Sequence, residues 1–139
     1  IQMSATQLAT YIFILHQSCC THHGGLVKAG QHHPLSEKDV QRLGRTYHAI
    51  CNLFRDTPIT DERSYLEDVP NIRGYIARIR TAIAHHIDDQ DIQFYTPQDT
   101  SDKSRYYIAI DPTKITLRIS SGEIPFMDYP FWKTLASKQ

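Results

Sequence analysis

A chain of 139 residues and 16.0 kDa is long enough for one domain with a hydrophobic core and too short for two ordinary domains. Hydrophobic residues make up 40% of it and charged residues 22%, and no stretch approaches the ~18 consecutive apolar residues of a membrane span, so we expect a soluble globular protein with no membrane partner. The 15 basic residues equal the 15 acidic ones, which excludes attraction of nucleic acid by the overall charge and requires any such contact to be local.

The first predicted helix begins at Ser4. Ser4 and Gln7 have the spacing of a capping box, in which the serine side chain accepts from a backbone N–H and the glutamine side chain reaches back. Apolar residues then recur at three- and four-residue steps as far as Cys19, which indicates a buried helical stripe. We expect Gly24 and Gly25 to end the helix and to open a flexible connection.

Ser36 is a second helix cap, and apolar residues keep helical spacing as far as Phe54. We therefore predict a second helix over about residues 37–55. A polar loop follows.

The third predicted helix has Asp68 as its cap and Pro70 near its first turn, where a missing N–H costs little. Its isoleucine stripe extends to Ile87. This helix would be the third and last helix of the bundle.

After Asp89 the apolar pattern changes from helical to alternating, which favours strands. Two β-rich runs flank the segment 111–114, where aspartate followed by proline suits a type I turn. We predict a hairpin over about residues 104–120. The aromatic run that starts at Tyr129 opens a last short helix, whose rings are expected to dock on the core.

The predicted fold is a single domain over residues 1–139 and is mainly α. Residues 4–90 form an up-down helical bundle, and residues 91–139 add the C-terminal β-hairpin and the short terminal helix. The N-terminus lacks the residue order of a signal peptide, and the three cysteines are an odd, poorly spaced set for disulfides. We therefore expect a cytoplasmic location.

The third helix is locally basic in a neutral chain. Residues 69–87 include three arginines, two histidines and no acidic residue. This local positive charge could bind an anion even though the net charge of the chain is zero. At ~100° per residue, His86 falls near the isoleucine stripe, so we expect it in the core or an interface, whereas His85 points away. Asp88 or Asp89 is expected to hydrogen-bond and orient a histidine.

Arg80 and His85 have the chemistry of a metal-independent ribonuclease. A guanidinium group can hold the scissile phosphate bidentately, and an imidazole with a pKa of ~6.5 can move a proton to or from the sugar hydroxyl or the leaving oxygen. Arg73 and Arg78 would add phosphate contacts. One helix sets Arg80 and His85 about 140° apart, so either the arginine wraps around the helix or a second subunit completes the site.

The stretch "IRTAIAHH" resembles the R-x4-6-H signature of the HEPN superfamily, small all-helical domains found in toxins and antiviral defence systems. The resemblance covers about residues 4–90. It implies a homodimer that cleaves RNA without a metal or other cofactor, often leaving a cyclic phosphate, and a cognate antitoxin or defence partner.

Carried over residue by residue, the resemblance makes Arg80 the motif arginine and His85 the motif histidine. His86 lies within the permitted spacing as a second histidine. Many members have Asn, Asp or His after the arginine, whereas this chain has Thr81, which keeps only a hydroxyl to position a phosphate oxygen or a water network. The resemblance therefore implies either an RNA endonuclease or a relative that binds RNA without cleaving it.

Other interpretations of the same residues stay open. Cationic residues in a last turn also complement the helix dipole, so Arg80 and His85 could serve stability alone. A non-enzymatic interaction or sensor module would instead use the adjacent histidine pairs as a surface for a partner or a metal.

A metal-dependent hydrolase is a further alternative. One side of the first predicted helix carries His16, Cys19, Cys20 and His23, and thiolate with imidazole is a ligand set that zinc prefers. Ligands on one straight helix cannot all surround a tetrahedral ion, so His32 or His33 would have to complete such a site.

Overall fold

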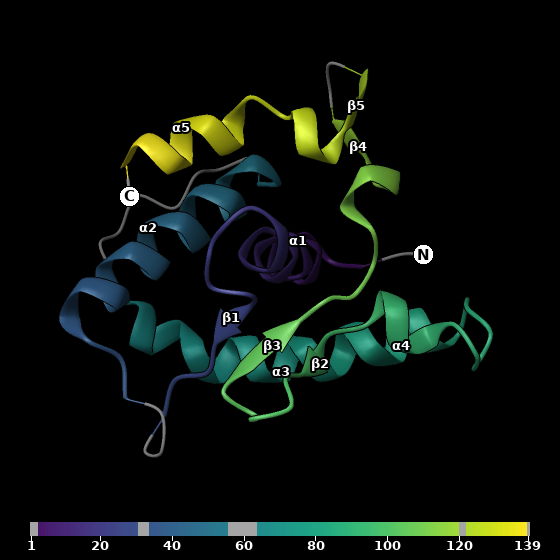
Figure 1. Ribbon diagram of the computed structural model, residues 1–139, viewed down its shortest axis with the longest axis horizontal. Coiled ribbons are helices and arrows are strands. Elements are labelled where there is room, and N and C mark those ends of the chain that lie inside the picture. Colours follow the sequence, from purple (N-terminus) through teal and green to yellow (C-terminus); the bar gives the residue numbers. More distant parts are fainter. Residues whose placement is uncertain (1–2, 31–33, 56–63, 120–121, 139) are drawn as a thin grey trace.

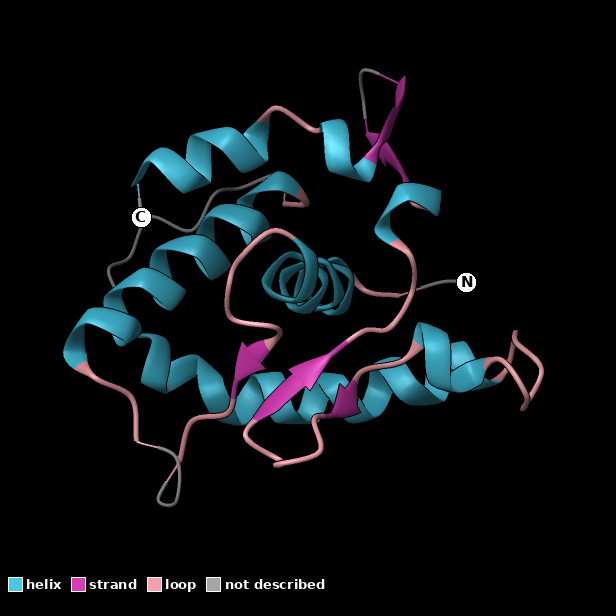
Figure 2. Ribbon diagram, in the orientation of Figure 1, coloured by secondary structure: helices cyan, strands magenta, loops and turns pink. Residues whose placement is uncertain are grey.

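The computed structural model describes residues 3–30, 34–55, 64–119 and 122–138. Helices dominate it, and the strands are short (Figures 1 and 2). The helices are α1 (Ala5–Cys19), α2 (Glu37–Leu53), α3 (Tyr65–Ala84), α4 (Ile92–Tyr95) and α5 (Phe131–Lys138). The strands are β1 (Leu26–Val27), β2 (Gln98–Asp99), β3 (Arg105–Tyr107), β4 (Thr116–Ile119) and β5 (Gly122–Pro125), with 3-10 turns at Pro112–Lys114 and Phe126–Asp128.

Helix α1 is the centre of the molecule. The predicted capping box is present, because Ser4 Oγ accepts from the Gln7 N–H at 3.1 Å and Gln7 Oε1 accepts from the Ser4 N–H at 3.3 Å. Every residue from Ala9 to Gln17 except half-buried Tyr11 is buried. Figure 1 shows the reason: α1 is seen end-on, with α2, α3, α5 and β3 around it. The helix ends at Cys19, before the two glycines that we expected to end it.

Helix α2 begins after Ser36 as predicted, since Ser36 Oγ accepts from the Asp39 N–H at 3.2 Å. The predicted start of α3 is wrong. Ser64 is its N-cap and accepts from the Leu66 N–H, so Pro70 lies inside the helix rather than in its first turn. Asp68 is therefore not the N-cap of α3. Its carboxylate is buried and bonds to a side chain of α2.

The predicted hairpin over residues 104–120 is also wrong. Strand β3 pairs antiparallel with β1 on one side and β2 on the other, in the order β1-β3-β2. Between β3 and β4, Asp111 caps a 3-10 turn by accepting from the Thr113 N–H at 3.0 Å. A C-terminal hairpin does exist, but β4 and β5 form it.

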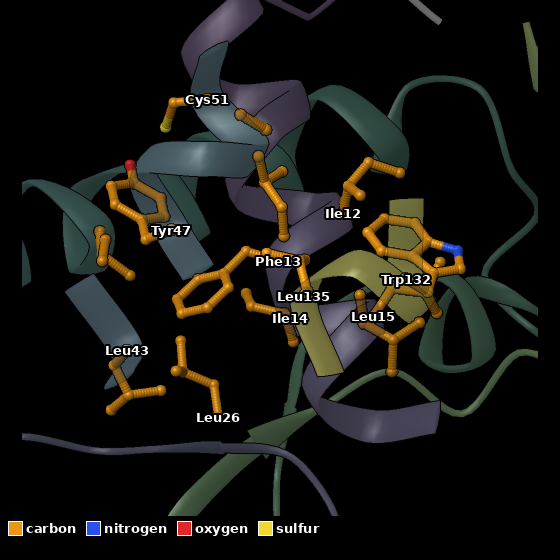
Figure 3. Close-up of a cluster of buried hydrophobic side chains, with 14 of the residues drawn as sticks. Ile12, Phe13, Ile14, Leu15, Leu26, Leu43, Tyr47, Cys51, Trp132 and Leu135 are labelled. Atoms are coloured by element: carbon orange, nitrogen blue, oxygen red, sulfur yellow. The ribbon is translucent and has the colours of Figure 1, made fainter. Parts of the chain in front are cut away.

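The terminal helix α5 covers α1. Its aromatic side chains dock on the core, as predicted. The Trp132 ring lies 4.9 Å from the His16 ring and 5.1 Å from the Phe126 ring, and its indole N–H donates to the Phe126 carbonyl at 2.6 Å. Figure 3 shows Trp132 and Leu135 among the α1 side chains Ile12, Phe13, Ile14 and Leu15. N- and C-terminal segments therefore share one core.

The mainly α class is confirmed, but the up-down bundle is not. In Figure 1, α1 points along the line of sight while α3 lies across it, so these helices cross rather than run along a common axis. Among the described residues, none of the helices combines the length and the apolar character needed to cross a membrane.

Candidate functional site

The residues of the "IRTAIAHH" stretch lie on the last turns of α3. Ile79 and Ile83 are buried, with exposed fractions of 0% and 3%, and they fix that face of the helix against the core. Arg80, Thr81 and His85 are consequently exposed on the remaining surface. The polar and apolar edges predicted from the helical spacing are both present.

The Arg80 guanidinium is anchored at one end. Its Nε donates to the carbonyl oxygen of buried Pro97 at 2.9 Å, in the segment between α4 and β2. Its two terminal nitrogens make no hydrogen bond to any described residue. A guanidinium held in this way has a fixed direction while its outer edge can still bind an oxyanion bidentately.

His85 and His86 are both exposed, so His86 does not lie in the core of this chain, and the other predicted place for it, an interface, stays a prediction. The physical reason is the end of the helix: α3 stops at Ala84, His85 is the C-cap, and the following turn carries His86 off the isoleucine stripe. Neither imidazole hydrogen-bonds to Asp88 or Asp89 in the described part of the chain. The Asp88 carbonyl instead accepts from two backbone N–H groups of the next turn.

The other residues predicted for this site differ in whether their side chains already make hydrogen bonds within the fold. Thr81 Oγ1 donates to the Ala77 carbonyl at 3.1 Å and keeps its lone pairs for another donor. Arg78 is exposed and makes no hydrogen bond or ion pair with the described residues. Arg73 donates to the Ala29 carbonyl and so ties the segment after β1 to α3. Its guanidinium is therefore partly used in holding the fold.

Two exposed aromatic side chains border the end of α3, and no sequence pattern predicts them as site residues. Phe94 and Tyr95 on α4 are 47% and 37% exposed, and α4 contacts α3 directly. The Tyr95 carbonyl accepts from the Tyr11 hydroxyl at 2.8 Å, which fixes α4 against α1. A four-residue helix is too short to show a 3.6-residue period, so its sequence was interpreted as part of an alternating run.

The described residues of the metal alternative, Cys19, Cys20 and His23, form no ligand cluster among themselves. Cys19 and Cys20 are half-buried and their thiol pKa values are raised by burial, that of Cys20 to about 11. Over the described ranges, no group of three His, Cys, Asp or Glu side chains could hold a metal ion. His32 and His33, which would have had to complete the site, lie outside the described residues.

His16 is a core histidine. Burial lowers its pKa to about 4, and its ring contacts Gln17 Nε2 through Nδ1 at 3.2 Å. Similarly, burial raises the pKa of the Cys51 thiol to about 11, which makes it a poor nucleophile. Both residues serve packing.

A histidine and carboxylate pair joins α2 to α3. His48 Nε2 lies 2.8 Å from Asp68 Oδ2, with side-chain exposures of 19% and 9%. No sequence pattern predicts this pair, because the residues lie 20 positions apart on two helices whose relative placement only the fold determines. The pair cross-links the two helices beside the ring of buried Tyr47.

Comparison with models of protein families, with curated proteins and with solved structures finds no match. The resemblance to the HEPN superfamily therefore depends on the residues of the α3 end themselves.

Proposed function

We propose that this domain is HEPN-like and binds single-stranded RNA at the C-terminal end of α3, where it acts as a metal-independent endonuclease of a toxin or antiviral defence system. The observation that carries the proposal is the Arg80 guanidinium, which is held through Nε by the Pro97 carbonyl and is exposed with its terminal nitrogens unused among described residues. His85 is exposed on the same helix end.

The surroundings of Arg80 suit a single strand better than a duplex. Arg78 and Arg80 supply charge for phosphate groups, and Phe94 and Tyr95 offer ring faces on which unpaired bases can stack. Bases in a duplex are already stacked, so this combination favours an unpaired segment.

The reaction proposed for these residues is cleavage of the RNA strand by the 2′ hydroxyl of the adjacent ribose. The 2′ oxygen attacks phosphorus, the bond to the 5′ oxygen breaks, and a cyclic phosphate remains. Arg80 stabilises the extra charge on the phosphate oxygens, while His85 moves a proton from the 2′ hydroxyl or to the leaving 5′ oxygen. Thr81 positions a phosphate oxygen or a water network.

The test is cleavage of a single-stranded RNA in EDTA by the full chain and its variants. Arg80→Ala and His85→Ala are each expected to lower the rate by about 10²- to 10⁴-fold. Both side chains are exposed, so the melting temperature should stay nearly unchanged.

Arg45→Ala is the matched control, because Arg45 is an exposed arginine on α2. Phe94→Ala should weaken RNA binding while leaving the chemical step intact. Undiminished cleavage by either Arg80→Ala or His85→Ala would remove the assignment.

A non-enzymatic interaction module is the second candidate, and a surface cavity favours it. The cavity has a volume of about 480 Å³ and lies between α1, the end of α2, β4 and the α5 region. It is lined by Ile12, Leu53, Phe54, Leu117, Arg118, Tyr129 and Trp132. Failure to degrade any RNA pool, together with a monomeric mass in solution, would favour this function.

A further inference from the structure

The surface cavity between α1, the end of α2, β4 and the α5 region, here called the Trp132 cavity, reaches into the core. Among its lining residues, Ile12, Leu117 and Trp132 are only 4%, 7% and 7% exposed. Figure 3 shows Ile12 and the Trp132 ring at the same end of the core. Its volume of about 480 Å³ lies within the range of small-molecule sites, about 300–1,000 Å³. A molecule of that size could therefore bury an apolar body here.

Aromatic rings form much of the cavity wall. The Tyr129 and Trp132 rings lie 5.3 Å apart with their planes at 79°, and Phe54, the C-cap of α2, adds a third ring. Aromatic rings attract one another in edge-to-face and offset-stacked contacts, beyond the effect of buried area alone. Three ring walls therefore favour an aromatic ligand over an aliphatic one.

Arg118 is the one charged side chain among the described residues that line the cavity. Its side chain is 84% exposed, so it lies at the mouth rather than in the depth. Its Nε and one terminal nitrogen both donate to the same oxygen of Glu123, at 3.2 and 2.9 Å. The other terminal nitrogen makes no hydrogen bond to any described residue.

The partner of Arg118 leaves room for a second anion. Glu123 does not line the cavity, and its side chain is 58% exposed. An exposed ion pair of this kind contributes little to stability, so a ligand carboxylate can share the guanidinium or replace Glu123 on it. The Tyr129 hydroxyl makes no hydrogen bond in the described part of the chain, which supplies a second donor among the lining residues.

We propose that the Trp132 cavity binds a small aromatic carboxylate. The ring of the ligand packs against the aromatic walls and the aliphatic floor, and its carboxylate accepts from Arg118 at the mouth. The site includes neither Arg80 nor His85, so it does not depend on the proposed cleavage of RNA.

The experiment compares two probes of the same shape, 2-naphthoate and its neutral amide 2-naphthamide, by calorimetric titration of the full chain at pH 7. Wild type is expected to bind naphthoate saturably and naphthamide about three- to tenfold more weakly, because only the carboxylate pairs with Arg118. Trp132 is the single tryptophan of the chain, so its fluorescence should change in parallel with the heat of binding.

Substitutions at the mouth separate the charge from the apolar contact. Arg118→Gln should lose the preference for naphthoate and bind naphthamide like wild type. Glu123→Gln should bind naphthoate more tightly, because the competing carboxylate is gone. Arg45→Gln changes an exposed arginine of α2 that does not line the cavity, and it should behave like wild type towards both probes.

Leu53→Asp tests the apolar rim. Leu53 is 37% exposed and lines the cavity, so an aspartate there should weaken naphthoate binding about tenfold or more by repulsion and loss of apolar contact. Leu66→Asp is the matched control, since Leu66 is 53% exposed on α3 and does not line the cavity. The melting temperature of each variant reports whether it is folded, and Arg118→Gln covers the case in which Leu53→Asp is not.

Three results would overturn the proposal. They are absence of saturable naphthoate binding, equal affinity of wild type for the two probes, and naphthoate binding by Arg118→Gln that matches wild type. Arg80→Ala should keep the naphthoate affinity, so failure of RNA cleavage and failure of this site are separate results.

Discussion

Histidine side chains in this protein take three different roles, which their local sequence does not distinguish. His16 is buried under Trp132, His48 is bonded to Asp68 between two helices, and His85 is exposed at the end of α3. The helical spacing predicted the exposure of His85 but not that of His86, because the place where α3 ends decides where His86 points.

The buried imidazole of His16 makes the folded state sensitive to acid. Its pKa falls from 6.5 to about 4 on folding, so above pH 6.5 the ring is neutral in both states. As the pH falls from 6.5 towards 4, the unfolded chain takes up a proton that the folded chain does not. This difference should lower the free energy of unfolding by about 3 kcal/mol over that window.

Urea unfolding at pH 7, 5 and 4 measures the effect. His16→Gln removes the titrating group, so the variant should be less stable than wild type at pH 7 but lose less stability on acidification. His22→Gln, at an exposed histidine, is the control. Parallel pH profiles for wild type and His16→Gln would contradict the assignment.

Among the elements, those with strong local signals were predicted well. The capping residues Ser4 and Ser36 mark the true starts of α1 and α2 because a cap satisfies backbone donors within its own turn. The short strands were not predictable in the same way. Strand β3 has three residues and pairs with β1 about 80 positions earlier in the chain, so neither alternation nor a turn sequence identifies its partners.

Helix α3 contains an internal proline that we expect to cost stability. Pro70 is the sixth residue of the helix, so it cannot donate to the Leu66 carbonyl as an ordinary residue would. Pro70→Ala should raise the free energy of unfolding by about 2 kcal/mol, less than the full ~3 kcal/mol because proline also restricts the unfolded chain.

The test is to measure the free energy of unfolding of Pro70→Ala and of the control variant Pro130→Ala by chemical denaturation. Pro130 immediately precedes α5, where a missing N–H costs little, so its replacement should change stability by less than about 0.5 kcal/mol. An equal response to the two substitutions would show that α3 accommodates its proline without loss.

At the scale of the whole molecule, the sequence predicted the mainly α class and the exposed polar edge of the α3 end, but not the central place of α1. The apolar run around Phe13 was treated as one stripe, whereas a helix that is apolar on all sides is buried on all sides.

The proposed ribonuclease is expected to be a homodimer with composite sites. If Arg80 of one subunit works with His85 of the other, a mixture of Arg80→Ala and His85→Ala chains forms heterodimers with one intact site. Such a mixture should recover about a quarter of the wild-type activity, since half of the dimers are mixed and each has one of two sites.

Light scattering measures the mass of the oligomer. The two inactive variants are then refolded together, and the RNA-cleaving activity of the mixture is measured. Either variant refolded alone is the control. A dimer that shows no recovery on mixing would place the two residues of each site in the same subunit.

The position of α1 also constrains how the protein is synthesised. Of the described helices, α1 leaves the ribosome first and packs at the centre, and one of its covers is α5, which contains Trp132 and is translated after the other four. The apolar surface of α1 therefore stays partly uncovered until α5 has been made, and exposed surface of this kind favours aggregation. Nascent chains that stop before α5 are the form of this protein that most needs a chaperone.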